Sequence, residues 1–264
     1  MASTSEQIGQ PSDYVDRQDL AVTWRTCGRV GLALNVGYDQ ISLRLTSSPG
    51  QVRFLISNAD RTPLQTDAAD LIAIERGASA QVHIPGIPLH EAIYSRRTGV
   101  RSIIHLHSRA ALAVSALECG LLPLSQTAME LFESISYSDF SDALDTPAER
   151  RRIASKVLQD HPCVLLRNHG LLAVGSSLHE AFYLAYHLEL ACSQQLSILS
   201  CGTGYVIPDP QLCRTVGREM SKQRADGSYR LWRALCADTA RIENWTLPRW
   251  AHEHFGTTAP LWLG

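Results

Sequence analysis

Arg101-Ser102-Ile103-Ile104-His105-Leu106-His107 (residues 101–107) joins an apolar run to two histidines at alternate positions. The apolar run predicts a buried β-strand, and side chains two residues apart on a strand point to the same face. His105 and His107 are therefore expected to lie close enough together to bind one metal ion.

A third histidine follows a second apolar run. Residues 163–168 read Cys-Val-Leu-Leu-Arg-Asn and predict another strand, and His169 comes directly after them. If the two strand ends are neighbours, three neutral imidazoles meet around one divalent cation and leave a coordination position open, which is typical of a catalytic metal. We expect His105, His107 and His169 to hold this metal, with zinc as the first expectation and iron(II) or manganese as alternatives.

Histidine spacing alone is a weak signal, because short motifs need a structural context before they support a function. A second His-x-His, His252-Glu253-His254, lies between aromatic residues near the C-terminus and has no strand pattern around it. We interpret this second pair as surface or subunit-contact histidines.

Length and composition indicate a globular protein. The chain has 264 residues, of which 45% are hydrophobic and 19% charged, and this suits one large domain or a domain with an extension. We expect a disordered lead over residues 1–12 and a domain over 13–208. A C-terminal extension over 209–264 is expected to be first helical and then aromatic.

Charge and cysteine content exclude several classes of function. The net charge is −2 and the basic residues form no block, which argues against a nucleic-acid surface. No apolar stretch reaches membrane-spanning length, and the N-terminus has no apolar signal core. We expect a cytoplasmic protein that acts on a small molecule, with neither nucleic acid nor membrane as a partner. The seven cysteines include no Cys-x-x-Cys pair, so we expect reduced thiols.

Hydrophobic periodicity, capping residues and turn residues predict the remaining elements. The first predicted helix begins at Ser12 and ends near Gly28–Gly31. Further helices are predicted over 88–97, 109–119, 125–133, 147–160, 178–200 and 211–242. The predicted strands cover 41–45, 52–57, 71–74, 80–84, 101–107 and 163–167, and an apolar run over 171–175 follows the last of them. Strands and helices mix without strict alternation, so we expect an α/β fold of three layers, with a central, mainly antiparallel sheet between helices.

Several segments between about residues 88 and 201 carry a family pattern in matching order and spacing. They are Leu89-His90-Glu91-Ala92-Ile93-Tyr94, Ile103-Ile104-His105-Leu106-His107-Ser108, Cys119-Gly120-Leu121-Leu122-Pro123-Leu124-Ser125, Leu165-Leu166-Arg167-Asn168-His169-Gly170-Leu171 and Glu180-Ala181-Phe182-Tyr183. This region resembles the class II aldolase/adducin family, and more closely its adducin-type branch than its sugar-phosphate aldolases. Beyond about residue 210 the likeness ends.

The resemblance implies a function for the three histidines. In metal-dependent members of the family, a divalent ion sits on histidines that match His105, His107 and His169. The ion polarises a substrate carbonyl or hydroxyl and stabilises an enediolate as a C–C bond breaks, which is Lewis-acid catalysis. The resemblance also implies a homotetramer with active sites at subunit contacts.

The chain departs from the sugar-phosphate aldolases where they bind phosphate and transfer protons. Their acid/base glutamate, four residues before the match to His90, is replaced by Gly86. Their small hydroxylic residues before that glutamate are replaced by Ile84 and Pro85, and their Thr-Pro-x-Gly turn reads Ser-Asn-Ala-Asp at 57–60. A phosphorylated sugar is therefore a poor substrate for this chain.

The sequence leaves alternatives for the residue that transfers protons. A tyrosine that acts as an acid in the aldolases matches Gln126 in a loose alignment. Glu91 is the candidate catalytic base, and the alternative is that Glu91 is a solvated helix residue while His90 packs under the sheet. Arg167 and Asn168 flank the third histidine, and either of them orients a ligand or a loop.

Three functions fit this pattern. The first is a metal-dependent carbon–carbon lyase, a decarboxylase or aldolase, that acts on an unphosphorylated oxo or hydroxy acid. Decarboxylation is favoured within this class because it needs no base to begin. The second is a non-heme iron oxygenase on the same scaffold, although two histidines and one carboxylate are the commoner iron ligands. The third is a non-catalytic, adducin-like assembly or binding module.

Overall fold

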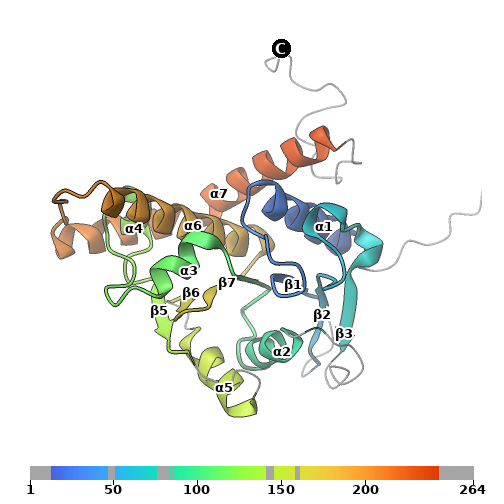
Figure 1. Cartoon of the computed structure of the whole chain (residues 1–264). Helices are drawn as coiled ribbons and strands as arrows, with labels where there is room; N and C mark the ends of the chain where they lie inside the picture. Colours follow the sequence, from blue (N-terminus) through green and yellow to red (C-terminus); the bar gives the residue numbers. More distant parts are fainter. Residues whose placement is uncertain are drawn as a thin grey trace, which may run out of the picture.

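The computed structural model describes residues 13–46, 51–75, 84, 86–140, 146–157 and 161–243. One seven-stranded sheet lies at its centre, and helices cover both faces (Figure 1). The strands are β1 (Gln40–Arg44), β2 (Arg53–Ile56), β3 (Ile72–Glu75), β4 (Ser102–Leu106), β5 (Ile135–Ser138), β6 (Cys163–Leu166) and β7 (Gly170–Gly175). The helices are α1 (Tyr14–Arg29), α2 (Ile87–Arg96), α3 (Arg109–Ser115), α4 (Gln126–Glu130), α5 (Pro147–Lys156), α6 (Leu178–Ser200) and α7 (Pro210–Ile242). Two short 3₁₀ helices are η1 (Pro63–Gln65) and η2 (Ala68–Asp70).

The sheet is mainly antiparallel, as the sequence predicted. Its strand order is β3-β2-β1-β4-β7-β6-β5, and only the edge pair β5–β6 is parallel. The predicted hairpin of β1 and β2 is confirmed, with Leu43 opposite Leu55. The sequence analysis missed β5, because Ile-Ser-Tyr-Ser at 135–138 shows little hydrophobicity.

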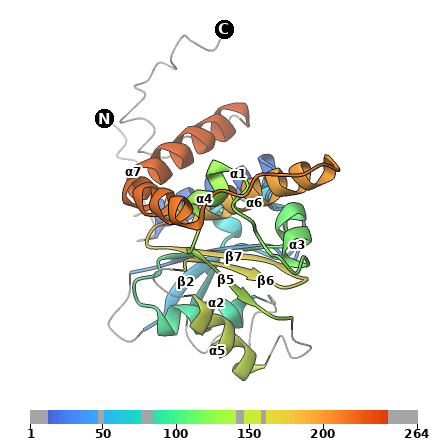
Figure 2. The same ribbon diagram turned by 90° about the vertical axis from the view of Figure 1, so that its left-hand side faces the viewer.

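Figure 2 shows the sheet from its side, with α2 and α5 on one face and the other helices on the opposite face. This three-layer arrangement confirms the predicted fold class. The layers follow from the alternation of buried side chains along each strand. In β4, Ile103 packs in the cluster under α2 and α5, while Ile104 and Leu106 pack in the cluster under α1 and α6.

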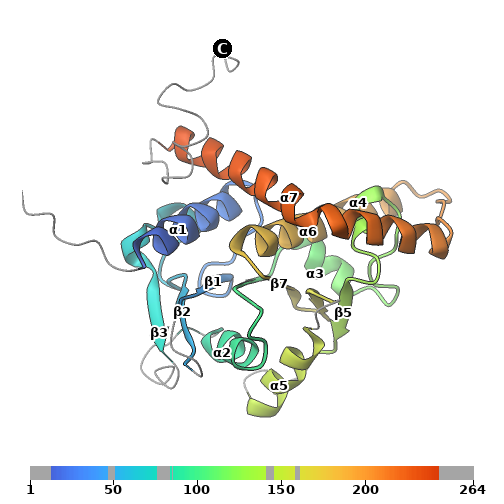
Figure 3. The ribbon, with the colours of Figure 1, turned by 180° about the vertical axis from the view of Figure 1, so that it is seen from behind.

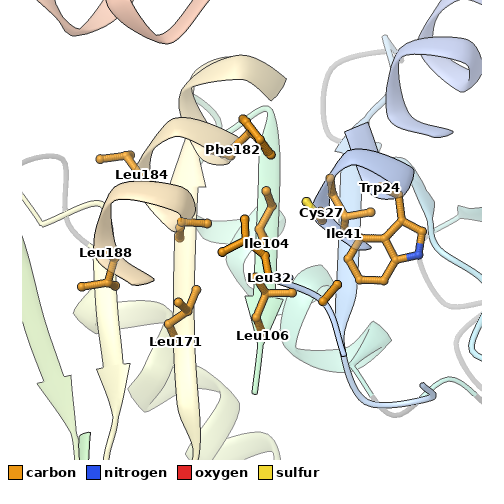
Figure 4. Close-up of a cluster of buried hydrophobic side chains, with 14 of the residues drawn as sticks. Trp24, Cys27, Leu32, Ile41, Ile104, Leu106, Leu171, Phe182, Leu184 and Leu188 are labelled. Atoms are coloured by element: carbon orange, nitrogen blue, oxygen red, sulfur yellow. The ribbon is translucent and has the colours of Figure 1, made fainter. Parts of the chain in front are cut away.

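The larger hydrophobic cluster joins α1 and α6 to the sheet. Figure 4 shows Phe182 and Leu188 of α6 beside Ile104 of β4 and Leu171 of β7, with Trp24 of α1 at the far side. Strands β6 and β7 contain only uncharged residues, and every residue of both strands is buried. Apolar packing on both faces therefore excludes water from this part of the sheet. All seven cysteines are free, as expected.

Helix α7 crosses the outer layer and packs against α1, α4 and α6 (Figure 3). Trp232 of α7 donates from Nε1 to Thr23 Oγ1 of α1 at 2.7 Å. The predicted helix over 211–242 is confirmed, and it joins the body of the molecule through these contacts. The expected disordered lead over 1–12 and the aromatic end over 244–264 lie outside the described residues. The domain boundary at 208/209 stays a prediction.

Three predicted elements need a correction or a limit. The helix predicted over 125–133 is shorter, because α4 covers only Gln126–Glu130. The helix predicted over 109–119 ends at Ser115. Arg167 of the β6–β7 loop donates from Nη1 to the carbonyls of Ser115 and Leu117, at 3.3 and 2.6 Å, and so takes acceptors that a longer helix would use. The strand predicted over 80–84 falls mostly on residues outside the described part. Within the described ranges, no helix is both long and apolar enough to cross a membrane.

The start of β1, the end of β4 and the start of β7 lie at the same end of the central strands. Three distant segments of the chain therefore meet there, at the edge of the sheet that the strand ends form. β4 ends at the edge where β7 begins, and Leu106 lies opposite Leu171. Gly170 makes this approach close, because a Cβ at residue 170 would lie 2.2 Å from the carbonyl oxygen of Leu106. The glycine that follows His169 therefore lets the hairpin of β6 and β7 meet the end of β4.

Replacing Gly170 with alanine should destabilise the protein by about 1–3 kcal/mol, because backbone must shift to admit the Cβ. Urea unfolding followed by circular dichroism measures the loss. Gly99→Ala is the matched control, since a Cβ there meets nothing within 4 Å. Equal stability of the two variants would contradict the packing argument.

Candidate metal centre

The three histidines predicted from the sequence meet at this edge. His105 lies near the end of β4, His107 follows that strand, and His169 lies in the loop between β6 and β7. One ring nitrogen of each lies within 4.8 Å of the other two. The Nε2 atoms of His107 and His169 are 2.8 Å apart. Nitrogens that bind one zinc lie about 2.1 Å from it, so this cluster is close to the size that one cation requires.

The other nitrogen of two of these rings has an acceptor of its own. Nδ1 of His105 lies 2.9 Å from the carbonyl oxygen of Leu171, and Nδ1 of His107 lies 3.0 Å from Oδ1 of Asp39. An Nδ1–H group that donates to such an acceptor leaves Nε2 unprotonated, with its lone pair free. Metal-binding histidines are typically oriented by a carboxylate or carbonyl in this way. The ring orientations therefore fit a divalent cation.

Asp39 is the residue that the sequence analysis missed. Its side chain is 1% exposed. Oδ1 accepts from the backbone N–H of His107 at 2.7 Å, besides facing the imidazole. Oδ2 accepts from the backbone N–H groups of Leu34 and Asn35, both at 2.8 Å. The available signal was an acidic residue directly before a strand predicted to lie in the same sheet.

The loop residues beside His169 orient the loop. Asn168 has φ of +57°, a left-handed conformation that asparagine tolerates better than most residues. The backbone N–H of His169 donates to the carbonyl of Leu166 at 3.0 Å, which closes a tight turn. The Arg167 guanidinium lies 4.5 Å from the centre of the Tyr137 ring and bonds carbonyls of the chain after α3. These contacts support the loop-orienting alternative for Arg167 and Asn168.

Burial keeps His105 and His169 neutral at neutral pH, because it lowers the pKa of both rings. It lowers the pKa of His105 well below 6.5, and the neighbouring charges of His107 and His169 lower it further. Burial, followed by the charge of His107, lowers the pKa of His169 to about 4. Neutral imidazole is the form that binds a metal ion. At neutral pH these two rings therefore need not lose a proton before they bind a cation.

Two exposed aromatic rings flank the histidines. Tyr38 is 63% exposed and packs edge-on against His107, with ring centroids 6.1 Å apart. Phe140 is 55% exposed and meets His169 in the same manner at 6.3 Å. The mouth of the centre therefore carries apolar as well as polar surface.

His90 and Glu91 lie on α2, and the structure gives them different surroundings. His90 is fully buried under the sheet, and its Nδ1 lies 2.7 Å from Ser42 Oγ. Burial lowers the pKa of His90 to about 3. Glu91 is half-buried and is not a member of the histidine group, which is the single such cluster found in the described part of the chain. Its catalytic role stays a prediction, and His252 and His254 lie outside the described residues.

Comparison with known proteins gives a family match over most of the chain. The family model described as Class II Aldolase and Adducin N-terminal domain matches residues 18–196. Beta-adducin of Rattus norvegicus is 38% identical over 179 residues, which are 64% of this chain and 25% of the adducin. The chain thus spans about a quarter of the length of this relative.

Solved structures share the fold over almost the whole chain. An aldolase II superfamily protein from Pseudomonas syringae superposes with a TM-score of 0.80 at 25% identity, covering 89% of this chain and 96% of that protein. The L-fuculose 1-phosphate aldolase from Glaciozyma antarctica PI12 superposes with a TM-score of 0.75, covering 92% and 95% of the two chains. Its identity is 19%, so this second likeness concerns the fold alone.

Replacing Asp39 with asparagine should weaken zinc affinity about 10–100-fold, because an amide cannot hold the His107 ring as a carboxylate does. Competition with a chromophoric chelator measures the affinity. Asp60→Asn, at an exposed turn, is the control and should bind zinc like the unchanged protein. An unaltered affinity in the Asp39 variant would show that the carboxylate does not orient a ligand.

Replacing His90 with asparagine should flatten the dependence of stability on pH. Unfolded His90 takes up a proton below pH about 6.5, whereas the folded residue does so only near 3, so falling pH favours the unfolded state. Over that window the residue removes up to about 1.4 kcal/mol of stability per pH unit. Urea unfolding at several pH values from 4.5 to 7.5 compares the two slopes, and identical slopes would refute the prediction.

Proposed function

Because the chain belongs to the class II aldolase and adducin family, we propose that it is a metal-dependent carbon–carbon lyase. The proposed substrate is an unphosphorylated oxo or hydroxy acid. The observation that carries the proposal is the convergence of His105, His107 and His169, with Asp39 and the Leu171 carbonyl behind two of the rings. A merely structural histidine cluster does not need acceptors that free the facing nitrogens.

The three histidines would hold the cation, and zinc is the first candidate, with manganese and iron(II) as alternatives. When bound, such a cation supplies Lewis acidity toward a carbonyl or hydroxyl oxygen of the substrate. Asp39 fixes the His107 ring through hydrogen bonds to its backbone and side chain. Tyr38 and Phe140 add aromatic rings that lie edge-on against His107 and His169.

We propose an unphosphorylated substrate because the residues near the start of α2 provide few groups that could bind a phosphate. Ile84 is buried and apolar, and Gly86 has no side chain to offer a ligand. Ser57 is buried, and its hydroxyl accepts from the backbone N–H of Ile41 at 3.2 Å. These positions offer little to a dianionic group, so the sugar phosphate named for the Glaciozyma enzyme is not carried over to this chain.

Decarboxylation is our preferred reaction within the lyases. In an oxo acid whose carbonyl lies next to the carbon that bears the carboxylate, the bond to the carboxylate breaks and CO2 leaves. The electron pair of that bond moves toward the carbonyl oxygen, and a proton later replaces the lost carboxylate. The first step needs no base, which suits a chain with Gly86 at the place where the aldolases carry glutamate. Glu91 remains our candidate for the proton transfer that follows.

A homo-oligomer, with a tetramer as the expected form, and a cytoplasmic location complete the proposal. Both come from the likeness to the family and from the composition of the chain.

The second candidate is a non-catalytic assembly module, which the identity with beta-adducin favours. Such a module would have no use for three converging imidazoles with oriented rings. The iron oxygenase is the third candidate, and it shares the same ligands.

Purified protein loaded with zinc or manganese should release CO2 or an aldehyde from members of a panel of oxo and hydroxy acids. Replacing both His105 and His107 with alanine should lower turnover at least about 100-fold, because the loss of Lewis acidity costs several kcal/mol. Coupled assays for both products, together with elemental analysis, make the measurement. His187→Ala, on α6, is the control and should retain turnover.

Each result separates the candidates. Absence of both products across the panel would refute the lyase. Retention of the oligomer with no turnover in any metal form would favour the assembly module, and oxygen uptake with iron would favour the oxygenase.

A further inference from the structure

Gln40 lies beside the histidine centre and has no part in holding it. It is the first residue of β1 and lies directly opposite His105 of β4 in the antiparallel register. Opposite residues of such a pair place their side chains on the same face of the sheet. Gln40 is 1% exposed, so its amide is buried next to a proposed metal ligand.

The amide oxygen of Gln40 has no hydrogen-bond partner within the described part of the chain. Oε1 is buried and accepts no hydrogen bond from the residues that the structure describes. A buried polar atom without a partner costs free energy and calls for a functional or structural reason. The chain supplies a contrast in Gln195, which is equally buried. Its Oε1 accepts from Leu122 N–H at 2.6 Å, and its Nε2 donates to the Gly120 carbonyl at 2.8 Å.

Gly86 provides the space for the Gln40 amide. A Cβ at residue 86 would lie 1.5 Å from Oε1 of Gln40 and 2.5 Å from its Cδ. Gly86 has φ of −81°, which any residue adopts, so the backbone does not require glycine here. The Gln40 amide therefore occupies the space that a side chain at residue 86 would fill, at the start of α2.

The backbone of Gln40 is fixed from both sides. Asp39 precedes it and is held by four hydrogen bonds, and Ile41 follows in register with Ile104. Because the side chain is also 1% exposed, few conformations are open to it before a ligand arrives. A fixed, buried acceptor beside a metal centre favours a ligand that brings an O–H donor, and it disfavours an analogue without one.

We infer that Gln40 is a specificity-determining residue whose Oε1 accepts a hydrogen bond from the hydroxyl of a substrate bound at the three histidines. Gly86, which has no side chain, leaves room for the amide that would make this contact. The inference rests on the proposed function and narrows it to acids that carry a hydroxyl group.

Glycolate and oxalate test the inference, because both are two-carbon acids that chelate a cation, and only glycolate carries a hydroxyl. Their binding to the Co²⁺-loaded protein is followed by visible absorption. Gln40→Met keeps the length of the side chain and removes the amide. It should weaken glycolate binding at least tenfold and change oxalate and Co²⁺ affinity less than twofold.

Gly86→Ala tests the same contact without touching Gln40. The added Cβ should displace the amide and cause the same selective loss of glycolate, and the double variant should be no worse than either single one. Gln211→Met, on the exposed first turn of α7, is the control and should bind both acids normally. Thermal unfolding of every variant reports the integrity of the fold.

The outcomes distinguish a failure of the proposed function from a failure of the inference about Gln40. If the unchanged protein binds neither Co²⁺ nor oxalate, the proposed function falls and this inference falls with it. If it binds both, but Gln40→Met leaves glycolate unchanged or weakens both acids equally, the inference alone is overturned. Additive losses in the double variant would also overturn it, since they would show that Gly86 acts through another contact.

Discussion

The buried carboxylate of Asp39 is the interaction on which the site depends. One oxygen accepts from the loop after α1, through Leu34 and Asn35, and the other accepts from the backbone and ring of His107. The carboxylate thereby ties the start of β1 to the end of β4. Four donors repay the cost of burying its charge. If this tie is lost, the neighbouring strands still pair, but the ring of His107 loses its orientation.

The electrostatics of the centre follow from this arrangement. Burial opposes a positive charge on the imidazoles of His105 and His169, so these rings remain neutral and present lone pairs. A divalent cation would restore positive charge at a place where a carboxylate already lies close by. The same burial therefore disfavours protons and leaves the nitrogens free for a metal.

The fold shared with the family and the residues particular to this chain explain different features of the site. The shared fold explains why β4 and the β6–β7 hairpin deliver histidines to one edge of a sheet. Gly86 offers neither charge nor side-chain volume, and Ile84 offers no polar group, so these two residues limit what this part of the chain can bind. A fold can thus be shared while the chemistry at its site differs.

The sequence by itself determined the strands β4 and β6, the long helices α6 and α7, and the three histidines, because these depend on short-range apolar patterns, helical periodicity and turn residues. It misplaced the end of α3, because Arg167, distant in sequence, takes the carbonyls there. Only the tertiary structure decided that Asp39 orients His107 and that Gln40 occupies the space beside Gly86. Both contacts join segments that are far apart in the chain, and the register of the sheet, which no local pattern encodes, brings them together.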